Sequence, residues 1–445
     1  MREATEGLTD RERFPLLDEE GARMLSRLRQ HPHAPRFNLR TGDRLDAAML
    51  ERVRRWEAAQ RESSPRWLPG QPPDWVEPFA AQALADVPIY RRAGVASFEA
   101  FSSVTRADLA REPWSFVPDA AALDDLMVFY TSGTTGKPLY VVTHPEVPAK
   151  KLALYRKAIR ACGGDMTGGA GRVALAFVCS QAKTLTYATI SSLLGQAGAV
   201  KVNLHPSQWS DPADRAKFLD DLDPEVLTGD PIGFADLAAL PVAIRPKALV
   251  SSAMTVTPSL RAKLEARFGC PVVDIYSTCE SGPIALARGD FYEVLPADLY
   301  VETLDADGNN CAPGVVGEIT LTGGRNPFLP LLRYRTGDYA ALESRDGKPV
   351  LTQLEGRAPV RFRTTDGRWI NNIDVATALR PLPLVQFSLL QKIDGSLLLR
   401  IRGDAGESPL RGALESLFGA GQPLAIEPIP DDAWKVVPYS SDLDR

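Results

Sequence analysis

The sequence predicts an α/β protein, on the strength of three patterns along the chain. Between about residues 80 and 330, short apolar segments typical of buried strands alternate with amphipathic helix patterns. Residues 315–355 favour short β segments, and residues 358–445 have their own mixture of strand and helix. We expect a large N-terminal part with mixed or parallel sheets flanked by helices and a small β subdomain, followed by a small α+β C-terminal domain.

The length of 445 residues exceeds one ordinary hydrophobic core and predicts several structural units. Residues 1–80 combine short helical patterns with a Pro- and Trp-rich segment, which indicates an N-terminal extension packed on a larger body. We expect the large domain to span residues 81–357 and the small domain to span residues 358–445.

Individual elements follow from their apolar spacing. Residues 126–130 and 139–142 predict two strands of a hairpin, and residues 185–194 predict a helix. Thr257 as N-cap, Pro258 after it and Gly269 as stop predict a further helix. The other buried strands of the large domain are expected at residues 172–178, 199–204, 225–228, 247–250 and 271–276.

Composition limits the partners. A net charge of -5 and a pI near 5.6 provide no broad basic face for nucleic acid or anionic lipid. The charged N-terminus lacks an apolar signal core, and no apolar stretch has the length of a membrane span. The five cysteines are scattered without a CxxC pair, which fits a reducing cytoplasm. We therefore expect a cytoplasmic protein without a nucleic acid or membrane partner.

The four histidines show no zinc-ligand spacing, so no structural metal is expected. His31 and His33 lie between prolines in a polar stretch, which predicts a solvated loop.

The most informative segment is the loop after residue 130, because glycines and hydroxyl side chains suit a polyphosphate. Glycines let backbone N–H groups approach an anion, and Ser and Thr hydroxyls donate further hydrogen bonds. The Walker loop is a poor match, and a plain surface turn remains the alternative. The candidate ATP-phosphate ligands are Thr131, Ser132, Gly133, Thr134, Thr135, Gly136 and Lys137.

Three further clusters follow downstream: residues 274–280 (DIYSTCE), 333–338 (RYRTGD) and 355–357 (EGR). They offer an aromatic ring for a base, one carboxylate for a metal, another for ribose hydroxyls, and arginines for phosphate or sugar. With the glycine-rich loop, this ordered set resembles the adenylate-forming superfamily of acyl-CoA synthetases, adenylation domains and luciferases. Residues 86–91 (DVPIYR) and 104–109 (VTRADL) are similar to the phenylacetate-CoA ligase-like subgroup.

The resemblance implies roles for individual residues. Tyr276 would stack on adenine, Glu280 would bind Mg²⁺, and Asp338 would accept hydrogen bonds from the ribose, with Arg357 nearby. The loop from Thr131 would hold the β- and γ-phosphates. Further nucleotide contacts are implied for Ser252, Ala253, Met254, Ser277, Thr278 and Cys279.

The resemblance also implies a catalytic lysine in the small mobile C-terminal domain. Only Lys392 and Lys435 lie beyond residue 358, and Lys435 is at the expected place near the end. The chemistry itself needs positioning and charge neutralisation rather than a general base, since a carboxylate nucleophile is already ionised.

Two departures from the family pattern matter. Ser277 and Cys279 stand where glycine and a hydroxyl residue are usual, and a thiol is the weaker hydrogen-bond donor. Pro359 follows the expected hinge and restricts its backbone. No histidine adjoins Cys279 in sequence, which argues against a covalent nucleophile there.

The resemblance therefore implies an ATP- and Mg²⁺-dependent ligase. It would activate an aromatic carboxylic acid as an acyl-adenylate, release pyrophosphate and pass the acyl group to a thiol such as CoA. One alternative is transfer to an amine, as in an amide-forming ligase. Another is a catalytically impaired nucleotide-binding regulatory protein. The resemblance also implies a homodimer.

Overall fold

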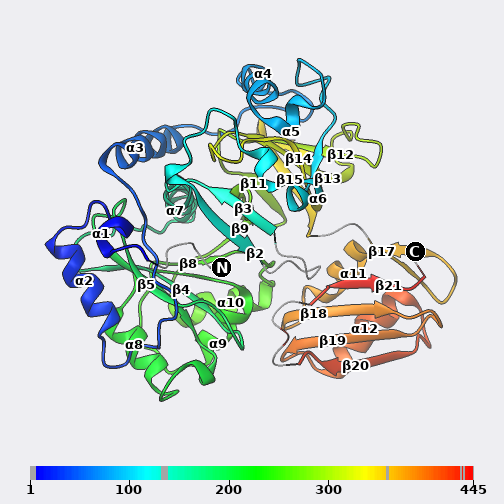
Figure 1. Cartoon of the computed structure of the whole chain (residues 1–445). Helices are drawn as coiled ribbons and strands as arrows, with labels where there is room; N and C mark the ends of the chain where they lie inside the picture. Colours follow the sequence, from blue (N-terminus) through cyan, green and yellow to red (C-terminus); the bar gives the residue numbers. More distant parts are fainter. Residues whose placement is uncertain (1–6, 132–138, 357–359, 431–432, 434–435, 444–445) are drawn as a thin grey trace.

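The computed structural model describes residues 7–131, 139–356, 360–430, 433 and 436–443. Figure 1 shows a large lobe and, beside it, a smaller lobe formed by the C-terminal residues. The architecture is mixed α/β, as the sequence predicts. Among the described residues, no helix has the length and apolar character needed to cross a membrane.

Five parallel strands form the centre of the large lobe. They are β4 (Val173–Cys179), β6 (Ala197–Asn203), β7 (Val226–Gly229), β8 (Ala248–Ser251) and β9 (Val272–Thr278). Their order in the sheet is β9-β8-β7-β4-β6. All five strand predictions are confirmed, and the parallel arrangement brings the carboxyl ends of the strands to one edge, where ligands bind in such sheets.

Helices cover both faces of this sheet (Figure 1). One face packs on α2 (Glu19–Arg29), α8 (Asp214–Leu222), α9 (Pro231–Ala239) and α10 (Pro258–Phe268). The other face packs on α7 (Glu146–Ala161). The two buried clusters leave the strands apolar on both sides, as expected for a parallel sheet.

One predicted helix is wrong. Residues 187–191 form strand β5 (Tyr187–Ser191), which runs antiparallel to β6 at the edge of the sheet. Ala188 and Ile190 are buried while Tyr187 and Thr189 are half-buried, so the segment alternates with the period of a strand. This segment pairs with the open edge of β6, and its side chains favour β structure. Both effects outweigh the helical spacing of its apolar residues.

The parallel sheet continues into antiparallel strands through the pairing of β9 with β10 (Gly282–Arg288). The order beyond β10 is β11-β15-β14-β13-β12, so the expected β subdomain is the extension of one mixed sheet. These strands are β11 (Phe291–Val294), β12 (Tyr300–Leu304), β13 (Val316–Gly323), β14 (Leu331–Arg345) and β15 (Lys348–Glu355).

The chain between residues 67 and 142 packs against this antiparallel part. Strand β1 (Val104–Thr105) pairs in parallel with β14, and α6 (Arg106–Arg111) follows at once. The predicted hairpin is confirmed as β2 (Met127–Thr131) paired with β3 (Leu139–Thr143). The remaining elements here are α4 (Val76–Asp86), α5 (Pro88–Arg91) and the 3-10 turns Pro113–Phe116 and Leu123–Asp125.

The N-terminal segment is attached to the large lobe by contacts along its length. It contains α1 (Asp10–Arg13) and α3 (Ala47–Glu62), and α3 packs on α7. His31 and His33 lie 3.4 Å and 2.8 Å from carboxylate oxygens of Asp221 and Asp214, near a 3-10 turn at Pro206–Gln208 and helix α8. The loop at His31 and His33 is therefore confirmed, but both rings are half-buried and lie beside carboxylates of α8 rather than being fully solvated.

The smaller lobe has its own sheet, in the order β20-β19-β18-β21, and its own apolar core. Its predicted strand and helix are confirmed as β19 (Leu397–Gly403) and α12 (Glu407–Phe418). The other elements are β16 (Arg361–Arg363), β17 (Trp369–Asn371), α11 (Asn372–Leu379), β18 (Leu384–Gln391), β20 (Leu424–Pro428) and β21 (Tyr439–Ser441).

Thr257 joins the two lobes at the N-terminus of α10. Its hydroxyl donates a hydrogen bond to the Leu384 carbonyl of β18 at 2.6 Å and accepts one from the Leu260 N–H at 3.3 Å. Gly269 ends the helix with φ 66°. All three sequence signals of this helix are thus confirmed, and the N-cap also contacts the smaller lobe.

We expect Thr257→Ala to lower the free energy of unfolding by about 1–2 kcal/mol, because it removes a helix cap and the inter-lobe hydrogen bond. Urea denaturation followed by circular dichroism measures the loss. Thr257→Ser keeps both bonds and should remain within about 0.5 kcal/mol of the wild type. Equal stability of the Ala and Ser variants would contradict the assigned role.

Asp274 is a buried carboxyl on β9. The Tyr292 hydroxyl donates to it at 3.2 Å, and an Arg261 guanidinium nitrogen lies 3.8 Å away. Burial outweighs the attraction of Arg261 and raises the pKa of Asp274 to about 6. The folded protein therefore holds a proton that the unfolded chain releases at a lower pH.

It follows that the contribution of Asp274 to stability is fully present below about pH 4 and is lost as pH rises through about 6. Relative to Asp274→Asn, which does not titrate, the wild type should lose up to about 3 kcal/mol across this window. Urea unfolding at pH 4.5 to 8 tests this, with Asp290→Asn on an exposed turn as control. Parallel stability profiles for the wild type and Asp274→Asn would refute it.

Candidate active site

The candidate site begins where β9 ends and the chain turns into β10. Residues 279–281 form the turn, and Gly282 resumes the strand with φ 71°. Thr278 and Ser281 share a hydroxyl–hydroxyl bond of 3.0 Å across the turn. This local structure holds Glu280 at the carboxyl end of the sheet, the edge at which a ligand is expected.

Arg325 binds backbone carbonyls in and beside the same turn. One of its guanidinium nitrogens donates to the Ser281 carbonyl at 2.6 Å and to the Pro283 carbonyl at 3.3 Å, and the other pairs with Asp298 at 3.1 Å. The sequence-based prediction missed this residue, since Arg325 lies outside every motif. The only signal for Arg325 in the sequence was its position after Gly323 and Gly324, which follow a predicted strand.

Glu280 is 3% exposed, and a buried carboxylate needs partners to remain charged. Arg106, the first residue of α6, pairs with its Oε1 atom, and the Tyr334 hydroxyl donates to the same oxygen at 2.9 Å. Burial, reinforced by the Glu280 charge, raises the pKa of Tyr334, so this hydroxyl stays protonated and donates. Arg106 and Tyr334, which lie 174 and 54 residues away from Glu280 in the sequence, thus contact the same carboxylate oxygen.

Tyr276 and Asp338 form a second pair. The Tyr276 hydroxyl donates to an Asp338 oxygen at 2.9 Å. Burial raises the pKa of Tyr276, and the Asp338 and Glu280 carboxylates add to the shift. Because the Glu280 charge acts on Tyr276, both pairs belong to one site.

The end of β15 lies beside Asp338. Tyr339 pairs with Glu355 in the ladder, and a Cβ added to Gly356 would lie 3.7 Å from an Asp338 oxygen. The chain therefore reaches the Asp338 carboxylate directly before Arg357. Arg357 itself lies outside the described residues.

Ser252, Ala253 and Met254 follow the carboxyl end of β8. Since Ser251 is paired with Asp274, these residues leave the sheet at the level of Ile275 and Tyr276. Ala253 has φ 76°, a left-handed conformation that is uncommon for alanine. The Met254 sulfur accepts a hydrogen bond from Gln386 of the smaller lobe at 3.8 Å, so this strand end borders both lobes.

The arginines of the 333–338 cluster have structural partners. Arg333 is buried, donates to the Phe101 carbonyl at 2.8 Å and pairs with Glu302 at 3.4 Å. Arg335 pairs with Glu318 at 2.7 Å. The expectation that these two arginines bind phosphate or sugar is therefore wrong, because carboxylates of neighbouring strands already neutralise them.

Several predicted site residues fall outside the described part of the chain. These are Ser132, Gly133, Thr134, Thr135, Gly136, Lys137 and Lys435, together with Arg357. Thr131 is the last residue of β2, so the phosphate loop would start from a defined strand end. Of the β9 motif, Ser277 and Thr278 are half-buried and Cys279 is exposed.

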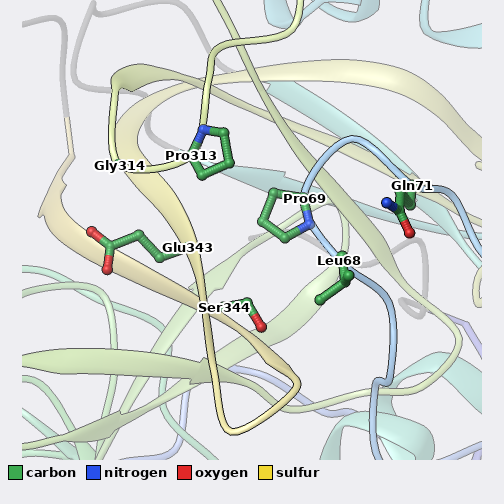
Figure 2. A pocket seen from close by; sticks show the side chains of 7 residues that line it. All are labelled: Leu68, Pro69, Gln71, Pro313, Gly314, Glu343 and Ser344. Carbon is green, nitrogen blue, oxygen red and sulfur yellow. The ribbon is translucent and has the colours of Figure 1, made fainter.

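Two cavities differ in their relation to these residues. A hollow of about 480 Å³ is lined by Leu68, Pro69, Gln71, Pro313, Gly314, Glu343 and Ser344, none of which is a predicted site residue (Figure 2). A cavity of about 10 Å³ is lined by Glu280, Ser281, Arg325 and Asn326 among others. The volume of the smaller cavity is at the lower limit for a single water molecule, and this cavity adjoins Glu280.

Within the described residues, no three His, Cys, Asp or Glu side chains are grouped so as to hold a metal ion by themselves. Mg²⁺ in nucleotide sites is commonly held through one or two carboxylates together with substrate phosphates. A single hard oxygen ligand such as Glu280 fits that mode of binding. The residues present therefore fit a metal that arrives with ATP.

Comparisons with known proteins identify the family of this chain. A family model described as AMP-binding enzyme matches residues 74–326, more than half of the chain. Protein CapK of Staphylococcus aureus is 28% identical over 152 residues, which is 33% of this chain and 31% of CapK. The match thus spans about a third of that relative.

Among solved structures, 2-hydroxyisobutyryl-CoA ligase in the postadenylation state, in complex with R3-HIB-AMP, is similar with a TM-score of 0.59 and 18% identity. That similarity covers 89% of this chain and 90% of the ligase. An open conformation of the same ligase gives a TM-score of 0.52 at 18% identity, covering 81% and 88%. At this identity the likeness concerns the fold. With the family model and the site geometry, it leads to one conclusion: the chain belongs to the AMP-binding, adenylate-forming family of enzymes.

Proposed function

We propose that this protein is an ATP- and Mg²⁺-dependent ligase that activates a carboxylic acid and transfers the acyl group to a thiol such as CoA. The observation that supports it most strongly is the convergence of Glu280 and the Tyr276–Asp338 pair on one site in a member of the AMP-binding family.

In the first half-reaction, an oxygen of the substrate carboxylate attacks the α-phosphorus of ATP. The bond between that phosphorus and the oxygen bridging to the β-phosphate breaks, and pyrophosphate leaves with the electron pair. The nucleophile is already ionised, so the protein has to orient it and neutralise charge. Mg²⁺ supplies positive charge to the phosphates when bound, and Glu280 would hold it.

The other residues have binding roles in this proposal. Tyr276 would stack on adenine, with its hydroxyl oriented by Asp338, and Asp338 would accept hydrogen bonds from the ribose hydroxyls. The loop from Thr131 to Lys137 would bind the β- and γ-phosphates. Arg106 and Tyr334 would orient Glu280, since both donate to its buried oxygen.

In the second half-reaction, the sulfur of the thiol would attack the carbonyl carbon of the adenylate, and AMP would leave. We propose that residues 358–445 act as a mobile domain that carries Lys435 toward the carboxylate and α-phosphate. We further propose that the protein is phenylacetate-CoA ligase-like and takes an aromatic acid. Phe177 on β4 and Tyr187 on the edge strand β5 are both half-buried, which supports a ring-binding pocket.

The proposal is tested by isotope exchange between pyrophosphate and ATP over a panel of aromatic and aliphatic acids, followed by product analysis with CoA, a carrier-protein thiol and amines. We expect Lys435→Ala to reduce exchange by at least about 100-fold, because a charge that stabilises the reacting phosphate is removed. Lys392→Ala, which changes the other lysine of the C-terminal domain, is the matched control. Full exchange in Lys435→Ala would exclude its catalytic role, and binding of ATP without exchange for any acid would contradict the proposed function.

Asp338 gives a test specific to the sugar. Wild-type protein should prefer ATP to 2′,3′-dideoxy-ATP, because the hydroxyls are the groups that Asp338 would bind. Asp338→Ala should reduce this preference by at least about tenfold, the size of one charge-assisted hydrogen bond. Asp290→Ala should leave the ratio of kcat/KM values unchanged. An Asp338 variant that still discriminates as the wild type does would show that the ribose lies elsewhere.

A further inference from the structure

Lys151 on α7 is an exposed lysine beside the candidate site. Its Nζ atom lies 5.5 Å from the centre of the Tyr155 ring, one helical turn further along α7. Tyr155 is buried and belongs to the core between α7 and the sheet, together with Ile275 of β9. The ammonium group is thus anchored over a rigid aromatic base rather than extended into bulk solvent.

Two other elements border this lysine. The Tyr155 side chain, and after it the Cys279 and Tyr187 side chains, raise the pKa of Lys151 above its ordinary value. Cys279 directly precedes Glu280, and Tyr187 begins β5. The lysine therefore lies between the strand end that carries Glu280 and the edge of the sheet.

Lys151 differs from the adjacent Lys150 in its ion pairing. Lys150 pairs with Glu146 at 3.1 Å, whereas Lys151 forms an ion pair with no carboxylate in the described part of the chain. Lys201 on β6 lies in register with Tyr187 and 4.8 Å from the Phe177 ring, but Asp230 is close enough to act on its charge. Lys151 therefore offers an ammonium group with which an anionic ligand can pair.

The surroundings favour an organic anion over a phosphate chain. Tyr155, Tyr187 and Phe177 provide aromatic walls, which suit the carbon skeleton of an acid. Sheet register places Tyr187, Lys201 and Phe177 in one row on one face. An acid whose reacting carboxylate lies near Glu280 could extend its other end along this row toward Lys151.

We propose that Lys151 is a specificity-determining residue that selects an acid carrying a second anionic group, such as a dicarboxylic acid. This inference rests on the proposed function, since it assigns the far end of the substrate in the same site. The second carboxylate pairs with the ammonium and leaves the first carboxylate to attack ATP.

The test compares matched acids that differ in one carboxylate: butanoate with glutarate, and phenylacetate with 4-carboxyphenylacetate. In pyrophosphate exchange, we expect the wild-type kcat/KM to be higher for the diacid of at least one pair by about tenfold or more. Lys151→Met should abolish that preference by raising the KM for the diacid. Lys151→Glu should reverse it toward 4-aminobutanoate. Lys217→Met, a surface lysine on α8, should change nothing.

Titration calorimetry of the diacids with wild-type and Lys151→Met protein measures the same pairing without catalysis, and circular dichroism verifies folding. Equal ranking of both acids by the wild type, an unchanged ranking in Lys151→Met, or a rise in KM for ATP instead of the acid would overturn the inference and leave the proposed function standing. Absence of exchange with every acid would contradict the proposed function, while tighter diacid binding by the wild type than by Lys151→Met would still support the pocket.

Discussion

The arrangement of the site depends on the buried carboxylate of Glu280. Burying a carboxylate at 3% exposure is costly unless donors bind it, and the chain brings such donors from two distant segments. Arg106 comes from the start of α6 and Tyr334 from β14. Because these donors meet on one oxygen, the antiparallel extension, the short helix and the end of the parallel sheet are held in one geometry.

Sheet topology explains why this point is also the candidate binding site. The parallel strands end at one edge, and β9 is the last of them before the chain turns into the antiparallel extension. The turn at residues 279–281 therefore lies where two kinds of sheet join, with Arg325 holding its carbonyls. Tyr276 and Asp338 approach from the two sides of that junction, which gives a nucleotide an aromatic ring and a carboxylate from different strands.

The same junction separates the groups proposed to bind the nucleotide from those proposed to bind the acid. Lys151, Tyr155 and Tyr187 lie on the α7 side of the sheet, next to Cys279. Asp338 and Gly356 lie on the side of β14 and β15. A single segment, residues 277–280 at the end of β9, connects the two sides.

The sequence by itself determined the elements whose signals are local. The cap, proline and glycine of α10 predicted its limits because helix ends are satisfied by nearby residues, and apolar runs predicted the parallel strands because both of their faces are buried. The resemblance of the ordered motifs to the adenylate-forming superfamily implied binding roles for Tyr276, Glu280 and Asp338. Only the tertiary structure decided that residues 187–191 form an edge strand and that carboxylates pair with Arg333 and Arg335. It also decided that Arg325, Arg106 and Lys151 border the candidate site. Those outcomes depend on which carboxylate or strand edge lies nearby in space, and pairing across a sheet leaves no periodic signal in the residues that it joins.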